Sequence, residues 1–256
     1  MSADISSKLN RLLSTQPSGI VLCSSWLVEN GYSLDLQQRY KKSQWFESIG
    51  AGALIRYGDH VDYLGGLHAM QTQLDLSVHP GGKTALGLQG KAHYLEFSAK
   101  HAQLFGAQGE HVPLWFKKRD WSVDVKCTLS NFLPAEIGLT EITHKQFTVK
   151  VSDPARAIME CLYLAPKSQS LLEAYELMEG LNNLRPASVQ KLLEVCNSVK
   201  VKRLFLYMAD KANHAWMQYL DLSRVNLGTG KRAIVASGVY IAKYQITVPK
   251  ELESME

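Results

Sequence analysis

The residues whose types and spacing come nearest to a reactive site are a glycine-rich run and an Asp-x-Lys pair. Gly82-Lys83-Thr84 matches the end of a P-loop, whose backbone amides cradle phosphate, but Ser77 stands where its first glycine belongs. Asp124-Val125-Lys126 is predicted to lie on a strand with both charges on one face, as in nucleases that bind magnesium. Such a site needs another acid upstream, and Asp120 is the nearest candidate. We therefore expect Gly81-Gly82 to form a turn, and the case for a nuclease is weak.

The cysteines and histidines are spaced too widely to suggest a metal site or a nucleophile. The four cysteines form no CxxC pair, and the eight histidines form no HExxH motif. The sequence therefore offers no positive case for an enzyme and predicts no catalytic residue, no metal ligand and no cofactor. The cysteines are expected to be reduced and mostly buried.

The residues that best fit a function lie on a predicted helix at 33–43. Helices are expected at 4–14 and 19–29, and Gly31 ends the second before Ser33 begins the third. Two helices joined by a tight turn containing glycine form a helix-turn-helix, whose second helix enters the major groove of DNA. Gln and Arg suit base edges, whereas Lys and Ser suit phosphates. The predicted DNA-binding residues are Ser33, Gln37, Gln38, Arg39, Lys41, Lys42, Ser43 and Arg56.

Two short strands are expected after this helix, at 45–49 and 53–57, joined by a Gly-Ala-Gly turn. Such a hairpin is a wing, and Arg56 or the turn backbone could contact the duplex. Residues 1–60 are therefore predicted to form a winged helix-turn-helix domain, with Leu34 and Leu36 as the core contacts of its third helix. Because these residues carry a net charge of only +1, a module that docks a protein is the alternative.

Residues 61–256 are expected to form a larger domain of mixed helix and sheet, so the predicted fold class is α+β. Ser152-Asp153-Pro154 has the cap and early proline of a helix start. Further helices are expected at 62–75, 83–90, 169–181, 187–196 and 198–211. Strands are expected in HYLEF, AQLFGA, VPLWF, SVDVKCTL, QFTVKVS, MQYLDL, AIVASG and YIAKYQITV.

Positive charge is concentrated near the end of the chain. Residues 198–243 hold eight bases against Asp210 and Asp221, a net charge of +6 within a chain whose total is +4. Clustered bases attract polyanions, although on a folded subdomain they could also point in different directions. The residues predicted to form this second basic patch are Lys200, Lys202, Arg203, Lys231 and Arg232.

The overall composition is that of a globular protein. Of 256 residues, 46% are hydrophobic and 20% charged, which excludes a disordered chain. No run approaches the roughly 18 uncharged apolar residues that span a bilayer, and the N-terminus lacks the apolar core of a signal peptide. We expect a cytoplasmic protein without a membrane partner.

Several spaced motifs occur along the chain. They are Tyr40-x-x-Ser43-x-Trp45, Gly81-Gly82-Lys83-Thr84-Ala85-Leu86, Gly90-x-x-His93-Tyr94-Leu95, Ser152-x-Pro154-x-Arg156-Ala157-Ile158-x-Glu160 and Leu227-Gly228-x-Gly230-Lys231-Arg232. Together these motifs resemble the AbiEi antitoxin family of AbiE-type, type IV toxin–antitoxin systems, from about residue 20 to 250. Gln44 departs from the family pattern, which has glycine at this position, and the departure concerns the angle at which the wing begins.

The resemblance implies two activities. The winged domain would repress the antitoxin's own operon by binding inverted repeats in promoter DNA. The C-terminal domain would counteract a toxin of nucleotidyltransferase fold, without a stable complex being required, and would help two copies bind DNA cooperatively. The alternatives are a module that binds the toxin or its tRNA substrate without specific DNA binding, and an enzyme that cleaves nucleic acid or modifies the toxin.

Overall fold

The computed structural model describes residues 2–91 and 100–254, with side chains from residue 8 onward, and the chain forms two compact units. Unit 1 consists of Met1–His79, Glu110–Val125 and Glu141–Lys150. Unit 2 consists of Pro80–Gly109, Lys126–Thr140 and Val151–Glu256. Each unit is therefore built from segments that are far apart in the sequence.

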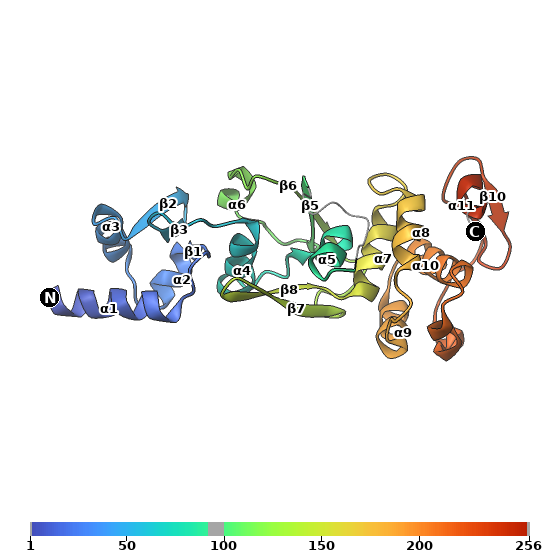
Figure 1. Ribbon diagram of the computed structural model, residues 1–256, viewed down its shortest axis with the longest axis horizontal. Coiled ribbons are helices and arrows are strands. Elements are labelled where there is room, and N and C mark those ends of the chain that lie inside the picture. The colour runs from blue at the N-terminus through green and yellow to red at the C-terminus, as the bar shows by residue number, and fades with distance from the viewer. Residues whose placement is uncertain (1, 92–99, 255–256) are drawn as a thin grey trace. The chain divides into compact units, whose positions relative to one another are not determined.

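The first 60 residues of unit 1 combine three helices with a small sheet (Figure 1). Their order is α1 (Ser2–Thr15), β1 (Leu22–Cys23), α2 (Ser24–Glu29), α3 (Leu34–Lys42), β2 (Phe46–Gly50) and β3 (Ala53–Arg56). The strands pair antiparallel in the order β1-β3-β2. The predicted third helix and the two wing strands are confirmed. The helix expected from residue 19 is wrong at its start, because β1 comes first and Cys23 occupies the N-cap of α2.

The core of this part follows the apolar faces of its helices. Leu12, Leu27 and Leu36 are buried, and the rings of Tyr40 and Phe46 meet edge to face at 5.7 Å. Leu34 does not join this core: its side chain is 63% exposed, which corrects the expectation that it packs inward. Leu34 is the first residue of α3, and it lies outside the buried side of this helix, which contains Leu36 and Tyr40.

Unit 1 continues beyond residue 60 through α4 (Tyr63–Gln73). The backbone of Val21 donates to Gly65 O at 3.3 Å, and a Cβ on Gly65 would lie 2.0 Å from Gly19 O. Gln73 is buried, accepts a hydrogen bond from Cys23 N at 2.7 Å and donates one to Val21 O at 2.9 Å. The side chain of Gln73 therefore satisfies backbone groups at β1 as a neighbouring strand would.

A short helix, α6 (Leu114–Lys118), also belongs to unit 1. The sequence VPLWF was expected to be a strand, and this prediction is wrong. Trp115 and Phe116 are adjacent and both buried, which a helix with one apolar side against the unit allows and an alternating strand does not.

Unit 2 is centred on α7 (Pro154–Leu164), where Asp153 caps the helix and Pro154 begins it, as predicted. Helices α5 (Gly82–Leu88), α8 (Leu171–Glu179), α9 (Pro186–Val195) and α10 (Val199–Lys211) pack against α7. Eight residues of α7 are buried. The helices expected at these places are confirmed.

The remaining strands form small separate sheets, so the predicted α+β class is confirmed. The first of them contains β4 (His79–Pro80), β5 (His101–Ala107) and β6 (Asp124–Ser130); β7 (Leu139–His144) pairs with β8 (Phe147–Ser152). Near the end, β11 (Ile246–Val248) lies between β9 (Arg232–Ala233) and β10 (Val239–Ile241), and α11 (Lys250–Ser254) follows.

YIAKYQITV, which was expected to form one strand, is divided by a turn into β10 and β11. MQYLDL forms short 3-10 helices, η1 (Ala215–Tyr219) and η2 (Leu222–Arg224), rather than a strand. Only the beginning of the predicted AIVASG strand is extended, as part of β9. The HYLEF segment lies outside the described residues.

No helix within residues 2–91 and 100–254 is both long enough and apolar enough to cross a membrane.

Candidate nucleic-acid interface

The turn between α2 and α3 fixes where α3 begins. Gly31 takes a φ of +86°, in the left-handed region that favours glycine, and its N–H donates to Val28 O at 3.0 Å. Ser33 then caps α3, because its Oγ accepts a hydrogen bond from Leu36 N at 3.3 Å. The predicted end of α2 and start of α3 are confirmed.

Gln37 lies inside unit 1, and this burial corrects the expectation that it faces a duplex. The side chain is 3% exposed, and its Nε2 donates to Tyr32 O at 2.8 Å and to Ser24 O at 3.2 Å. The hydroxyl of Ser24 donates to Oε1 of Gln37. One side chain of α3 therefore holds that helix to the start of α2 and to the turn between them.

Four of the predicted DNA-binding residues lie on the outer side of α3, which also exposes the acid Asp35 in its first turn. Gln38, Arg39 and Lys42 are exposed, and Lys41 is half-buried. None of these three cations forms an ion pair within the part of the chain that the structure describes. They lie in the last turn, where a positive charge is favourable beside the carbonyl end of the helix dipole. This arrangement presents one amide and three unpaired positive charges along a single helix.

The end of α3 explains the unusual Gln44. Its φ is +55°, its N–H donates to Lys41 O at 3.1 Å, and Trp45 N donates to Tyr40 O at 3.0 Å. These two bonds form a Schellman motif, in which the left-handed residue is usually glycine. Gln44 therefore adopts the conformation that glycine would adopt, and the chain still turns directly from α3 into β2. Ser43, the C-cap, is exposed beside this turn.

An exposed aromatic pair lies where the hairpin begins and ends. Trp45 is 48% exposed and Tyr57 is 56% exposed, and Tyr57 N donates to Trp45 O at 3.0 Å. Indole and phenol groups both carry hydrogen-bond donors that suit phosphate oxygens. The sequence motif contains Trp45 but not Tyr57. The signal that could have identified both is a large aromatic residue at each end of a short hairpin.

The hairpin itself carries little charge. Its tip is Ala51-Gly52, and the Arg56 side chain is directed to α1, where Nη2 donates to Leu13 O at 2.9 Å and also to Gln16 O. Arg56 therefore satisfies two carbonyl groups at the end of α1. The expectation that it is available to contact DNA is not met.

The residues of the predicted second basic patch, in unit 2, differ in burial: some lie inside the unit and others lie on its surface. Lys200 donates to Tyr163 O at 2.7 Å and to Ala165 O at 2.6 Å, which caps the carbonyl end of α7. Burial, with a smaller contribution from Lys167, lowers the pKa of Lys200. Lys202 is only 4% exposed. Neither lysine presents a free charge on the surface.

Arg203 is also buried, where it shapes the loop that contains the other two members of the patch. Its side chain is 2% exposed and donates to Leu227 O at 2.8 Å, Gly230 O at 2.7 Å and Gly228 O at 3.1 Å. The loop that it organises displays the exposed residues Lys231 and Arg232. The predicted patch therefore reduces to these two side chains.

Other bases of the same segment are paired or stacked. Lys243 forms an ion pair with Asp210 at 2.6 Å, and Arg224 forms one with Glu194 at 3.0 Å. Lys211 lies over the Tyr175 ring at 5.6 Å. The net charge of +6 is therefore not a continuous positive surface, because burial and ion pairs remove much of it.

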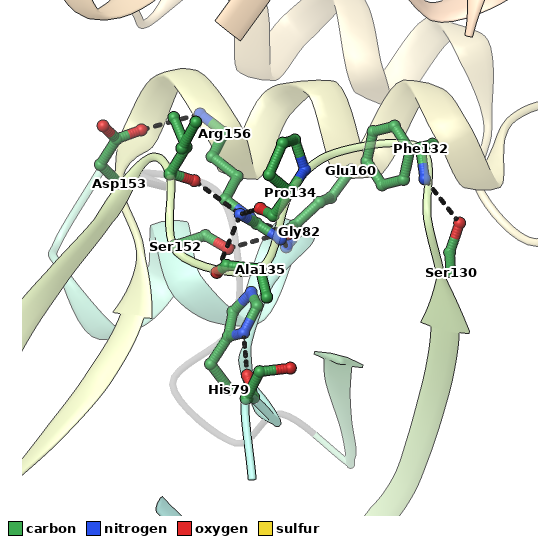
Figure 2. Close-up of polar contacts among 12 residues, drawn as sticks. His79, Gly82, Ser130, Phe132, Pro134, Ala135, Ser152, Asp153, Arg156 and Glu160 are labelled. Atoms are coloured by element: carbon green, nitrogen blue, oxygen red, sulfur yellow. Dashed lines mark hydrogen bonds and ion pairs between the residues drawn. The ribbon is translucent and has the colours of Figure 1, made fainter. Parts of the chain in front are cut away.

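The glycine-rich run does bind a carboxylate, but one from the same chain (Figure 2). Glu160 Oε2 accepts hydrogen bonds from Gly82 N at 2.9 Å and Ser152 Oγ at 2.7 Å, and Arg156 Nε donates to its Oε1 at 2.8 Å. A Cβ on Gly81 would lie 2.3 Å from this carboxylate. Arg156 continues to the carbonyl oxygen of Pro134 at 2.7 Å. The motif that begins at Gly81 and the motif that runs from Ser152 to Glu160 therefore meet in one buried network.

Three of the four thiols are buried, and the Asp-x-Lys pair lies on β6. Burial raises the pKa of Cys23 to about 12 and also raises the pKa of Cys161 and Cys196, so these three buried thiols lack the lowered pKa of an activated nucleophile. Asp120 accepts a hydrogen bond from Ser122 N at 2.8 Å. In residues 2–91 and 100–254 no group of three His, Cys, Asp or Glu side chains is placed to hold a metal ion.

Comparison with known proteins covers nearly the whole chain. Residues 5–97 match the N-terminal domain of the AbiEi antitoxin, a transcriptional regulator, and residues 99–249 match the family of transcriptional regulators described as AbiEi antitoxins of type IV toxin–antitoxin systems. No curated protein matches the chain. A crystal structure of the RV2827C protein from Mycobacterium tuberculosis is similar in fold, with a TM-score of 0.58 and 14% identity over 94% of this chain and 89% of that one. The two family matches together show that this chain belongs to the AbiEi antitoxins, transcriptional regulators of type IV toxin–antitoxin systems.

Proposed function

We propose that the chain represses its own operon by inserting α3 into the major groove of an inverted repeat in promoter DNA. The observation that carries this proposal is the outer side of α3, where Gln38, Arg39 and Lys42 are exposed and the cations are unpaired. Gln37 supports it indirectly, since its hydrogen bonds hold α3 at a fixed position on α2. The DNA-reading elements of this proposal lie within residues 1–60.

Each exposed residue has a proposed role. Gln38 and Arg39 read base edges, because an amide and a guanidinium make paired hydrogen bonds with adenine and guanine. Lys41 and Lys42 bind phosphates, with Ser33 and Ser43 as hydroxyl donors at the two ends of the helix. Two copies on an inverted repeat would each read one half-site.

The test is fluorescence anisotropy of the full chain on DNA from upstream of its own gene and on a random duplex, at two salt concentrations. A specific repressor is expected to prefer its own DNA by about a thousandfold or more, with a steep salt dependence. Weak binding that is equal on both duplexes would contradict the proposal and would favour a docking module.

Variants of α3 separate the two roles. Lys41→Ala with Lys42→Ala should weaken binding on every duplex and reduce the salt slope by about 0.9 for each phosphate that is no longer neutralised. Gln38→Ala or Arg39→Ala should instead reduce the preference for the operator, by about 1–3 kcal/mol for each base that is no longer read. Equal weakening on operator and random DNA for all of these variants would refute the assignment of roles.

We further propose that residues 61–256 counteract a nucleotidyltransferase-like toxin. Lys231 and Arg232 are the exposed charges of the predicted basic patch, held on a loop by Arg203. Co-expression with a candidate nucleotidyltransferase-like toxin, with growth as the readout, tests the antitoxin role. Lys231→Gln with Arg232→Gln should reduce rescue if this loop acts on the toxin or its tRNA substrate, whereas reduced cooperativity on DNA with normal rescue would assign the loop to repression.

A further inference from the structure

The wing hairpin offers DNA almost no positive charge of its own. Its exposed residues are Ser48, Ala51 and Gly52, and its single base, Arg56, donates to the carbonyl groups of α1. Glu47 accepts a hydrogen bond from Gly58 N at 3.3 Å. A wing of this composition has backbone groups for a phosphate but no cation to attract one.

A distant part of the sequence packs against this hairpin. Helix α6 contacts β2, and a Cβ on Gly50 would lie 2.8 Å from the Cβ of Trp115. The absence of a side chain at Gly50 therefore allows α6 to approach the end of the strand closely. The helix is further held by its neighbour Trp121, whose Nε1 donates to Phe116 O at 2.8 Å.

The other side of α6 is positively charged. Lys117 and Lys118 are exposed, and the guanidinium of Arg119 lies over the Trp121 ring, 5.2 Å from its centroid. None of these three cations is ion-paired within the described residues. The nearest acid in sequence, Asp120, accepts a hydrogen bond from Ser122 N at 2.8 Å. Three positive charges therefore stand together beside the wing.

Strand β2 connects this cluster to the proposed recognition helix. Tyr40 of α3 contacts Phe46 at the start of β2, and α6 contacts Gly50 at its end. A strand of this length spans about 17 Å, at roughly 3.3 Å per residue. One helical turn of DNA is about 34 Å, so the cations of α3 and α6 can fall within the same half-site.

We propose that Lys117, Lys118 and Arg119 form a second phosphate-binding site, which contacts the DNA backbone beside the wing and replaces the cations that the wing lacks. The inference rests on the proposed function of α3, and it assigns a DNA contact to a segment about 60 residues after the hairpin. Its ligand is the phosphate backbone, so it adds affinity without sequence preference.

The experiment compares the full chain with Lys117→Gln/Lys118→Gln, measuring the salt dependence of binding to the operator and to a random duplex. Removing two phosphate-binding cations should reduce the slope of log K against log salt by about 1.8 on both duplexes, and should weaken binding at about 0.1 M salt by roughly tenfold or more. The preference for operator over random DNA should stay unchanged.

Lys150→Gln/Lys191→Gln is the matched control. Both lysines are exposed, they lie on β8 and α9, and their replacement removes the same charge. Equal changes of slope in the two double variants would overturn the proposal, since net charge would then explain both. Thermal unfolding of each variant shows that the fold is retained.

The two proposals fail differently. If the wild-type chain prefers its operator but Lys117→Gln/Lys118→Gln has an unchanged slope, the α6 site is refuted and the role of α3 stands. If the wild-type chain shows no preference, the repressor proposal fails, and the slope on the random duplex still decides whether α6 binds phosphate. A wild-type chain that binds neither duplex would refute both.

Discussion

At the scale of single residues, polar side chains act in this protein according to their burial. Gln37 and Gln38 are neighbours on α3, yet the first is 3% exposed and satisfies the backbone at Ser24 and Tyr32, while the second faces solvent. A buried amide stabilises the fold only when its donors and acceptor are satisfied, as those of Gln37 are. Gln37 therefore has a structural task, whereas Gln38 is free to take the recognition role that the proposed function gives it.

Gln44 provides a test at this scale. Its φ of +55° costs an ordinary residue about 1 kcal/mol, whereas glycine adopts this conformation without strain. We expect Gln44→Gly to raise the free energy of unfolding by about 0.5–1 kcal/mol, measured by urea denaturation.

Gln38→Gly is the control for this substitution. Gln38 is exposed within α3, where glycine should lower the free energy of unfolding by about 1 kcal/mol. The same sign of change in both variants would show that conformation at residue 44 is not the cause.

At the scale of elements, buried charges join segments that the sequence separates. Glu160 and Arg156 on α7 bind the start of α5 and the carbonyl oxygen of Pro134. Arg203 on α10 binds the loop at 227–230 in the same way. In both places a charged side chain satisfies backbone groups of a turn or loop, which fixes a segment that has few ladder hydrogen bonds of its own.

The network around Glu160 provides the second prediction. Glu160→Gln leaves the guanidinium of Arg156, which is 4% exposed, without its carboxylate. Breaking a buried pair in this way is expected to lower the free energy of unfolding by about 3–5 kcal/mol, measured by urea denaturation at neutral pH.

Asp210→Asn serves for comparison, since it removes the exposed pair with Lys243, which should contribute at most about 1 kcal/mol. A destabilisation by Glu160→Gln no larger than that by Asp210→Asn would show that the buried network does not stabilise unit 2.

At the scale of the whole molecule, the compact unit that contains the proposed DNA-binding helix does not end at residue 60. Val21 and Cys23 bond to Gly65 and Gln73 of α4, and α6 packs against β2 from more than 60 residues away. Unit 1 therefore depends on parts of the chain that a division at residue 60 assigns to the antitoxin domain.

A pair of fragments tests this dependence. A fragment of residues 1–60 should unfold at a lower temperature than a fragment of residues 1–79, because only the longer one retains α4 over β1. Circular dichroism during thermal unfolding measures the difference. Gln73→Leu in the longer fragment should lower its free energy of unfolding by about 1–3 kcal/mol for each backbone group left unsatisfied. Equal melting temperatures for the two fragments would show that α4 adds no stability to the winged part.

The sequence by itself determined the features that depend on neighbouring residues. Ser33 caps α3, Asp153 and Pro154 begin α7, and a Gly-Ala-Gly turn joins two short strands, because each involves atoms only a few positions apart. The family motifs likewise lie within short segments. These features were enough to predict the α+β class, the order of most helices and the family.

Only the tertiary structure decided which charged and polar side chains reach the surface. Gln37, Arg56 and Arg203 are residue types that are common on binding faces. In the structure each donates a hydrogen bond to a backbone carbonyl that lies between 5 and 43 positions away in the sequence. Spacing in the sequence cannot show such partners, because burial depends on how distant segments pack. The same reason explains why VPLWF forms a helix rather than the predicted strand, and why sequence spacing does not place the cations of α6 beside the wing.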